Sequence, residues 1–299
     1  MRTRISDDEL NTKIGRIVTD RDANLLLTGP AKIIKPDNRV LCVYLPAAMR
    51  TAVEAPGVWD LLHSLKSQVT DNRVYASGSP RYTDAGGQRR AARPVPSAVV
   101  GAVDPGGRTH YCRLTAWTGK HLPQWRSLQP MLQAVAGHLA EAVPDRYAAQ
   151  AAEAARARPE WVVPGTPFTT ITVNNSYATG VHTDKGDLDA GFSTITCLRR
   201  GDYTGGHLVF PRWRVAVDLQ HGDLLCMDAH DWHGNTQMVC ACGTDLNGPC
   251  PDCGAERISV VSYFRSNMVN CGSAQAEMTK AQQRADQRSG HDAPDPAAH

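Results

Sequence analysis

The chain has 299 residues, of which 41% are hydrophobic and 21% are charged, and its formal net charge is +2. These values are ordinary for a globular protein of one large domain or two modest ones, and the net charge by itself indicates no class of partner. No apolar run approaches the ~18 residues of a membrane-spanning helix, and the N-terminus lacks the apolar core of a signal peptide. We therefore expect an intracellular, monomeric protein with no membrane partner.

Residues 1–160 have the pattern of a mixed helical and extended region. Apolar residues recur at helical spacing in 58–67 and in 128–142, and an Ala-rich helix is expected over 147–157. Between the first two, residues 76–96 are rich in Gly, Ser, Pro and Arg, a composition typical of a surface loop.

From Phe168 the hydrophobic pattern changes to period two, and we expect a second domain over 161–270. Short alternating segments separated by Gly, Asp and Asn predict strands at 168–174, 192–198, 207–210, 214–219, 223–228 and 258–264. Many short strands of this kind are typical of a sandwich, a jelly roll or a barrel. Residues 271–299 lack apolar periodicity, so we expect a disordered tail there.

Nine cysteines are spread unevenly along the chain. Four lie in one short segment within 240–253, whereas the other five are scattered. An odd count with this distribution argues against a disulfide framework.

Three side chains in the second half of the chain have the chemistry of a metal site. His182 and Asp184 lie two positions apart in a loop, and in extended backbone such positions point the same way. His233 follows a later strand, and two imidazoles with one carboxylate leave open the positions that a ferrous centre needs. Because His-x-Asp is common by chance, the stronger indication is Arg257, whose planar guanidinium can bind a carboxylate through two parallel hydrogen bonds.

A series of motifs spans residues 165–266. They are Phe-Thr-Thr-Ile-Thr-Val-Asn-Asn at 168–175, Val-His-Thr-Asp-Lys-Gly-Asp at 181–187, Gly-Gly-His-Leu-Val-Phe-Pro at 205–211, Gly-Asp-Leu-Leu-Cys-Met-Asp at 222–228, Trp-His-Gly-Asn-Thr at 232–236 and Arg-Ile-Ser-Val-Val-Ser-Tyr at 257–263. In this order they resemble the TET/J-binding-protein (TET/JBP) family of Fe(II)/2-oxoglutarate-dependent nucleic-acid-base oxygenases. The motifs Tyr-Ala-Ser-Gly-Ser-Pro at 75–80 and Tyr-Cys-Arg-Leu-Thr-Ala-Trp at 111–117 resemble the phage and bacterial branch less specifically.

The resemblance implies an α+β fold and a set of site residues. The fold would be a double-stranded β-helix (jelly-roll) core at 161–270, with the mixed α/β extension at 1–160 packed on it. Fe(II) would be held by His182, Asp184 and His233, while Arg257 anchors 2-oxoglutarate and the Ser259 hydroxyl donates to the same carboxylate. His230 competes for the place of His233, but the family has its ligand in the Trp-His-Gly-Asn context. Dioxygen is the other co-substrate of the implied reaction.

The implied substrate is the 5-methyl group of thymine or 5-methylcytosine in DNA, and the sequence does not distinguish the two. Such a base must be flipped out of a duplex or already single-stranded. The stretch 73–126 is locally basic, and we expect substrate contacts from Asn174, Arg81, Arg89 and Arg90. One alternative is an oxygenase acting on a small molecule or a protein side chain. Another is a catalytically inactive DNA-binding module, against which the intact set of iron and 2-oxoglutarate residues argues.

The four clustered cysteines lie between His233 and Arg257 in the sequence. Cys240, Cys242, Cys250 and Cys253 flank a short loop containing Gly and Pro, and this arrangement predicts a tetrahedral structural zinc site. We expect zinc to close the insertion at 240–253, so that the residues on either side keep their positions. The alternative is an insertion whose thiols are reduced and hold no metal.

Overall fold

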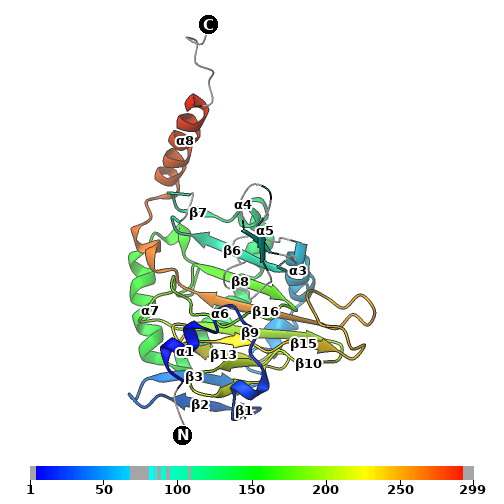
Figure 1. Cartoon of the computed structure of the whole chain (residues 1–299). Helices are drawn as coiled ribbons and strands as arrows, with labels where there is room; N and C mark the ends of the chain where they lie inside the picture. Colours follow the sequence, from blue (N-terminus) through cyan, green and yellow to red (C-terminus); the bar gives the residue numbers. More distant parts are fainter. Residues whose placement is uncertain are drawn as a thin grey trace.

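The computed structural model describes residues 5–67, 81–83, 85, 89–91, 95–106 and 109–291. Its largest feature is an eight-stranded antiparallel sheet with the order β2-β3-β13-β9-β16-β8-β6-β7 (Figure 1). The strands are β2 (Ala31–Ile34), β3 (Val40–Leu45), β6 (Ser97–Val103), β7 (Arg113–Leu114), β8 (Thr170–Asn175), β9 (Ser193–Arg200), β13 (Leu224–Met227) and β16 (Glu256–Tyr263). Because side chains alternate along a strand, Arg257 and Ser259 share one face of the sheet and Ile258 lies on the other.

A second sheet faces this one and closes the jelly roll. It has the order β1-β12-β11-β14, with β1 (Leu25–Leu27), β11 (Leu208–Phe210), β12 (Val215–Val217) and β14 (Gly234–Asn235). Phe210 and Val215 from this sheet pack in one apolar cluster with Ile195 and Leu225 from the large sheet. Both sets of residues recur with period two, so the pattern that predicted strands also selected the side chains of the interior. The predicted jelly-roll core is confirmed.

Helices cover the outer face of the large sheet. They are α2 (Arg50–Val53), α3 (Val58–Ser64), α4 (Ala116–Lys120), α5 (Leu122–Ser127), α6 (Gln129–Ala142) and α7 (Pro144–Arg156). Leu132 and Val135 of α6 lie in one buried cluster with Ile171 and Val260 of the sheet. The helices predicted at 58–67, 128–142 and 147–157 are confirmed within a few residues. No helix in the described ranges is long and apolar enough to cross a membrane.

The remaining elements are short. They are α1 (Asp7–Asn11), the hairpin of β4 (Arg81–Thr83) with β5 (Arg89–Ala91), the two-stranded antiparallel sheet of β10 (Tyr203–Gly205) with β15 (Met238–Cys240), and 3-10 turns at Asp20–Asp22, Leu65–Ser67, Pro159–Trp161 and Ser266–Asn270.

The C-terminal segment differs from the expected disordered tail, because residues Ala274–His291 form helix α8. Figure 1 shows this helix projecting from the body of the protein. Its base is held by Glu277, a buried carboxylate that accepts hydrogen bonds from the backbone N–H groups of Cys112 and Gly272, each at 2.8 Å. Tertiary contacts at its base thus accompany the order of a segment that has no apolar periodicity.

One disulfide joins Cys112 to Cys271 and ties the segment before β7 to the start of α8. The sequence argued against a disulfide framework, and this single bridge was not predicted. The two cysteines are separated by 159 positions in the sequence, so their spacing could not reveal the pairing.

Candidate active site

His182 and His233 are brought together by their own backbones. The N–H of His182 donates to the carbonyl of His233 at 2.9 Å, and the N–H of His233 donates to the carbonyl of His182 at 3.0 Å. This isolated antiparallel bridge places the two imidazole rings with their centroids 4.3 Å apart. Two side chains from distant segments therefore face one point without the help of a ligand.

A second set of hydrogen bonds orients each ring. His182 Nδ1 lies 2.7 Å from the carbonyl oxygen of Gly180, and His233 Nδ1 lies 2.8 Å from that of Asp231. Since a carbonyl only accepts, each Nδ1 carries the proton and each Nε2 presents a lone pair. This is the arrangement in which metal-binding histidines are usually held.

Asp184 completes the group. Its Oδ1 lies 3.6 Å from His182 Nε2 and its Oδ2 lies 3.7 Å from His233 Nε2. One ligand atom from each residue lies within 4.8 Å of the others, and the N–H of Asp184 donates to the carbonyl of Ala229 at 3.0 Å. Two neutral nitrogens and one carboxylate oxygen on one side of a point are the donor set of a facial triad for Fe(II). The residues present therefore fit the metal.

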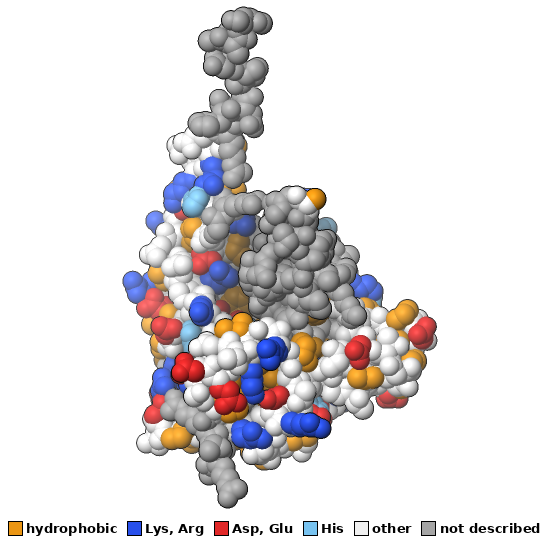
Figure 2. Space-filling model, in the orientation of Figure 1, with side chains coloured by type: hydrophobic (Ala, Val, Ile, Leu, Met, Phe, Trp, Pro, Cys, Tyr) orange, Lys and Arg blue, Asp and Glu red, His pale blue; other side chains and the backbone are white. Residues whose placement is uncertain are grey.

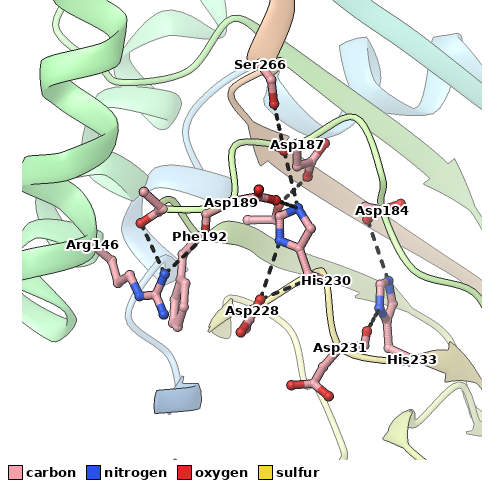
Figure 3. A network of polar contacts seen from close by, with 12 residues as sticks. Arg146, Asp184, Asp187, Asp189, Phe192, Asp228, His230, Asp231, His233 and Ser266 are labelled. Atoms are coloured by element: carbon pink, nitrogen blue, oxygen red, sulfur yellow. Dashed lines mark hydrogen bonds and ion pairs between the residues drawn. The ribbon is translucent and has the colours of Figure 1, made fainter. Parts of the chain in front are cut away.

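His230, the alternative distal ligand, points elsewhere (Figure 3). Its Nε2 lies 3.0 Å from Asp189 Oδ1 and its Nδ1 lies 3.5 Å from Asp228 Oδ1. The hydrogen bond to the Asp228 carboxylate raises the pKa of His230 above its usual value. The residues that converge on one point are thus His182, Asp184 and His233, and His230 is absent from this group in the described part of the chain.

Arg257 lies on β16 on the interior face of the large sheet, and only 3% of its surface is exposed. The adjacent Arg199 pairs with Asp218, whereas no carboxylate of the described residues forms an ion pair with Arg257. The neighbours of its guanidinium are the Cys197 thiol and the Tyr203 phenol, whose buried hydroxyl has no hydrogen-bond partner within the described ranges. A buried cation without an anion is costly. The site fits the distal carboxylate of 2-oxoglutarate.

Ser259 and Asn174 lie beside one another on this interior face. They are opposite residues in the β16–β8 register, and both are buried. The Asn174 Oδ1 accepts a hydrogen bond of 2.6 Å from Ser97 Oγ. Asn174 thus lies next to Ser259 within the jelly roll, two positions along β16 from Arg257.

For the three arginines expected to contact the substrate, the structure describes the strands that carry them and not their side chains. Arg81 lies on β4, and Arg89 and Arg90 lie on β5, which pairs with β4 in an antiparallel hairpin. Their side chains, and most of the basic stretch before residue 95, fall outside the described residues.

A cavity of about 350 Å³ opens beside the triad. Its wall includes His182, Asp184, Thr172, Val261 and Tyr263, with Lys185, Asp187 and Arg265 at its edge. The hydroxyls of Thr172 and Tyr263 lie 3.0 Å apart. Sequence reasoning assigned no role to Tyr263 or Arg265. The sequence did contain a signal for Tyr263. Side chains alternate along a strand, so Val261 and Tyr263 lie on the same face as Arg257 and Ser259.

Asp187 is the polar group at the edge of this cavity that sequence reasoning missed. Its Oδ2 accepts a hydrogen bond of 2.6 Å from Ser193 Oγ. Burial, together with the negative charge of Asp184, raises the pKa of Asp187 to about 7.

The four clustered cysteines also converge. Their sulfur atoms lie within 4.8 Å of one another, and Cys240 Sγ lies 3.5 Å from Cys250 Sγ. Four thiolates at about 2.3 Å from a tetrahedral zinc ion would stand roughly 3.8 Å apart. Cys240 and Cys250 are buried, whereas Cys242 and Cys253 are exposed.

Comparison with known proteins places this geometry in a family. Residues 104–266 match Tet_JBP, described as the oxygenase domain of the 2OGFeDO superfamily. The chain belongs to the TET/JBP family. The matched stretch exceeds half of the chain and contains the His182, Asp184, His233 and Arg257 constellation. Membership implies Fe(II) as cofactor and 2-oxoglutarate as co-substrate.

Individual TET/JBP relatives share part of the chain. The thymine dioxygenase JBP1 of Crithidia fasciculata is 35% identical over 155 residues, which are 52% of this chain and 18% of that protein. JBP1 of Trypanosoma brucei brucei is 35% identical over 156 residues, 52% of this chain and 17% of that protein. The aligned stretch is thus less than a fifth of these relatives.

A solved structure shares the fold. NgTET1 in complex with 5mC DNA superimposes with a TM-score of 0.57 at 13% identity, covering 93% of this chain and all of that one. At this identity the likeness extends to the fold alone. It includes the region before residue 104, which the family match does not reach.

Proposed function

We propose that this protein is an Fe(II)/2-oxoglutarate-dependent dioxygenase that hydroxylates the 5-methyl group of a pyrimidine base in DNA. The observation that carries the proposal is the convergence of His182, Asp184 and His233 on one point, with His182 and Asp184 lining a cavity of about 350 Å³. The buried Arg257, which has no carboxylate partner among the described residues, supplies the second half of the site.

Each side chain has a distinct task in this proposal. His182, Asp184 and His233 hold Fe(II), while Arg257 and the Ser259 hydroxyl bind the distal carboxylate of 2-oxoglutarate. With dioxygen, the bound metal and co-substrate supply the oxidation that converts a methyl C–H bond to C–OH. The protein's own contribution is to hold one methyl group beside the metal and to keep other C–H bonds and water away.

The cavity beside the triad is the proposed place of the base. Val261 offers an apolar wall, and the Thr172 and Tyr263 hydroxyls and the Asp187 carboxyl offer hydrogen bonds to a base edge. Because a paired base cannot reach the metal, the nucleotide enters flipped out or as single-stranded DNA. Asn174 supports the 2-oxoglutarate side, next to Ser259.

We assign contact with the DNA backbone to Arg81, Arg89 and Arg90 on the β4–β5 hairpin. On the face shown in Figure 2, the described Lys and Arg side chains are interspersed with Asp and Glu. A mixed surface of this kind attracts a polyanion only weakly, so the basic stretch at 73–126 remains the proposed source of positive charge.

The relatives support a 5-methylpyrimidine in two ways. The curated relatives, at 35% identity, are named thymine dioxygenases, and the structurally similar NgTET1 was solved with 5mC DNA. Both substrates present a methyl group on carbon 5 and differ at position 4. Thymine is the first base to test, because the thymine dioxygenases are 35% identical in the aligned stretch whereas NgTET1 is 13% identical.

The decisive experiment is chemical. Full-length protein is incubated with Fe(II), ascorbate and 2-oxoglutarate on single- and double-stranded oligonucleotides that contain thymine or 5-methylcytosine, and the digested nucleosides are weighed. We expect one added oxygen atom on one of the two bases, and none with the His233→Ala control. Release of succinate without any modified base would favour a small-molecule or protein substrate. No iron-dependent succinate release from metal-binding protein would favour an inactive DNA-binding module.

We further propose that Cys240, Cys242, Cys250 and Cys253 hold a structural zinc ion. The support is the close approach of their sulfur atoms. Cys240 and Cys250 pack in one cluster with Tyr203 and with Ala255, which lies two positions before Arg257. Zinc at this place would hold the two-stranded β10–β15 sheet against the 2-oxoglutarate side of the site.

A further inference from the structure

Lys35 is a buried cation that the proposed function does not use. It follows β2 directly, and only 5% of its surface is exposed. Its Nζ lies 2.7 Å from Asp228 Oδ2 and 2.9 Å from Asp231 Oδ2, and both aspartates are themselves buried. One ammonium group from the N-terminal region therefore binds two carboxylates from a single loop, and it lies outside the family match at 104–266.

The two aspartates belong to the loop that carries His233 and contacts Asp184. The carbonyl of Asp231 accepts from His233 Nδ1 at 2.8 Å, and the carbonyl of Ala229 accepts from the N–H of Asp184 at 3.0 Å. Figure 3 shows Asp228 and Asp231 on this loop beside His233. Any shift of the segment 228–231 would move one imidazole and one carboxylate of the triad together.

Other contacts hold the same loop and use the Oδ1 atom of each carboxylate, whereas Lys35 binds the Oδ2 atoms. Arg212 Nε lies 4.0 Å from Asp231 Oδ1, and His230 Nδ1 lies 3.5 Å from Asp228 Oδ1. The N–H of Asp228 donates to the carbonyl of Leu41 at 2.9 Å, and Trp213 Nε1 donates to Asp231 Oδ1 at 2.9 Å. These contacts fix one end of the loop each, whereas the ammonium joins both ends. Because buried ion pairs seldom stabilise a fold more than apolar packing does, their better-supported role is to select one arrangement.

The N-terminal region also contacts the loop segment that leads to His182. The N–H of Gly15 donates to the carbonyl of Val181, and the N–H of Val181 donates to the carbonyl of Arg16, both at 2.9 Å. A Cβ added at Gly180 would come within 2.6 Å of the Gly15 backbone, so the two segments pack without space for a side chain. Residues that precede the matched family domain thus contact both the segment before His182 and the segment before His233.

We propose that Lys35 is a positioning residue that sets the geometry of the metal centre by joining Asp228 to Asp231. This inference rests on the proposed function, because it takes His233 and Asp184 to be metal ligands. It goes beyond that function in assigning to the N-terminal region a part in metal binding.

The test measures metal binding and needs no turnover. Full-length Lys35→Met is titrated with Co(II), and the dissociation constant and the visible absorption spectrum of the bound ion are compared with those of the unaltered protein. Loss of groups that orient metal ligands typically weakens affinity by about 10- to 100-fold, and we expect an effect of that order together with a changed spectrum. Lys32→Met is the matched control, because Lys32 is an exposed lysine on β2, and it should bind Co(II) normally.

A second variant guards against misfolding of Lys35→Met. Asp231→Asn keeps the size of the side chain and leaves the Lys35–Asp228 pair intact, and we expect it to weaken Co(II) binding several-fold and to change the spectrum. Loss of stability alone would lower the melting temperature and leave the spectrum of the folded, metal-bound protein unchanged. Normal affinity and an unchanged spectrum in either folded variant would overturn the proposal.

His233→Ala in the same titration separates this inference from the proposed function. If His233→Ala loses Co(II) while the Lys35 and Asp231 variants bind it normally, the assignment of the metal centre is supported and the positioning role of Lys35 is contradicted. If His233→Ala also binds normally, the assignment of the metal centre is itself wrong.

Discussion

The backbones of His182 and His233 hydrogen-bond to each other in both directions, at 2.9 and 3.0 Å. The pairing joins the loop after β8 to the loop after β13, and each imidazole is further held through Nδ1. Two ligands are consequently oriented by the polypeptide before any ion arrives. A site of this kind loses little conformational freedom on binding metal, which favours tight and selective coordination.

The first prediction distinguishes the two candidate distal ligands. His233→Ala should weaken Co(II) or Mn(II) binding by more than about 100-fold, since even changes behind the ligands cost roughly 10- to 100-fold. His230→Ala should bind either ion normally, because its ring contacts Asp189 and Asp228 instead of the triad. Isothermal titration of both variants provides the measurement, and equal losses in the two would contradict the assignment.

The second prediction concerns 2-oxoglutarate. Arg257→Met should raise the dissociation constant for 2-oxoglutarate by about 10- to 150-fold, since a hydrogen bond to a charged group contributes about 1.5–3 kcal/mol. Metal affinity should be unchanged. Arg200→Met is the control, because Arg200 is exposed and lies on the opposite face of the sheet. Titration calorimetry measures the binding of 2-oxoglutarate to the two metal-loaded variants. Equal dissociation constants for Arg257→Met and Arg200→Met would disprove the role of Arg257.

The third prediction concerns zinc. Protein expressed with zinc should contain one zinc ion per chain by elemental analysis. Cys253→Ser should lose it and melt at a lower temperature, because a structural site contributes to folding directly. Asp252→Ser, an exposed neighbour, should keep both the zinc ion and the melting temperature. Unaltered protein that carries no zinc, or Cys253→Ser that retains it, would refute the site.

The fourth prediction concerns pH. The Asp228 carboxylate raises the pKa of His230 in the folded protein above its ordinary value. At pH values between the ordinary pKa of His230 and its raised pKa in the folded protein, the folded protein binds more protons than the unfolded chain. The stabilisation is therefore fully present below about pH 6.5 and is lost as the pH rises through the folded value.

His230→Gln should accordingly lower the melting temperature more at pH 6 than at pH 9. The expected difference is about 1–3 °C, since a partly exposed ion pair contributes roughly 1 kcal/mol or less. Thermal melts of both proteins across this range test it. A difference that grew toward high pH would reverse the sign and reject the linkage.

The strands and helices that build the site were predictable from local pattern. Period-two alternation at 258–264 predicted β16, and helical spacing at 128–142 predicted α6. The ligand residues were predictable as well, although His-x-Asp is common by chance, because Arg257 follows in the expected order and the surrounding motifs resemble a known family. Helix α8 was missed, since its order depends on the buried Glu277 and on the Cys112–Cys271 bridge.

What the sequence determined by itself was the chemistry available and the alternation that sends side chains inward, because both depend on residues a few positions apart. The tertiary structure decided which of those side chains share a cavity. It separated His233 from His230, placed Tyr263 beside the triad and brought Lys35 to the ligand loop. These contacts join residues far apart in the chain, and they depend on strand order and register, which local preferences do not encode.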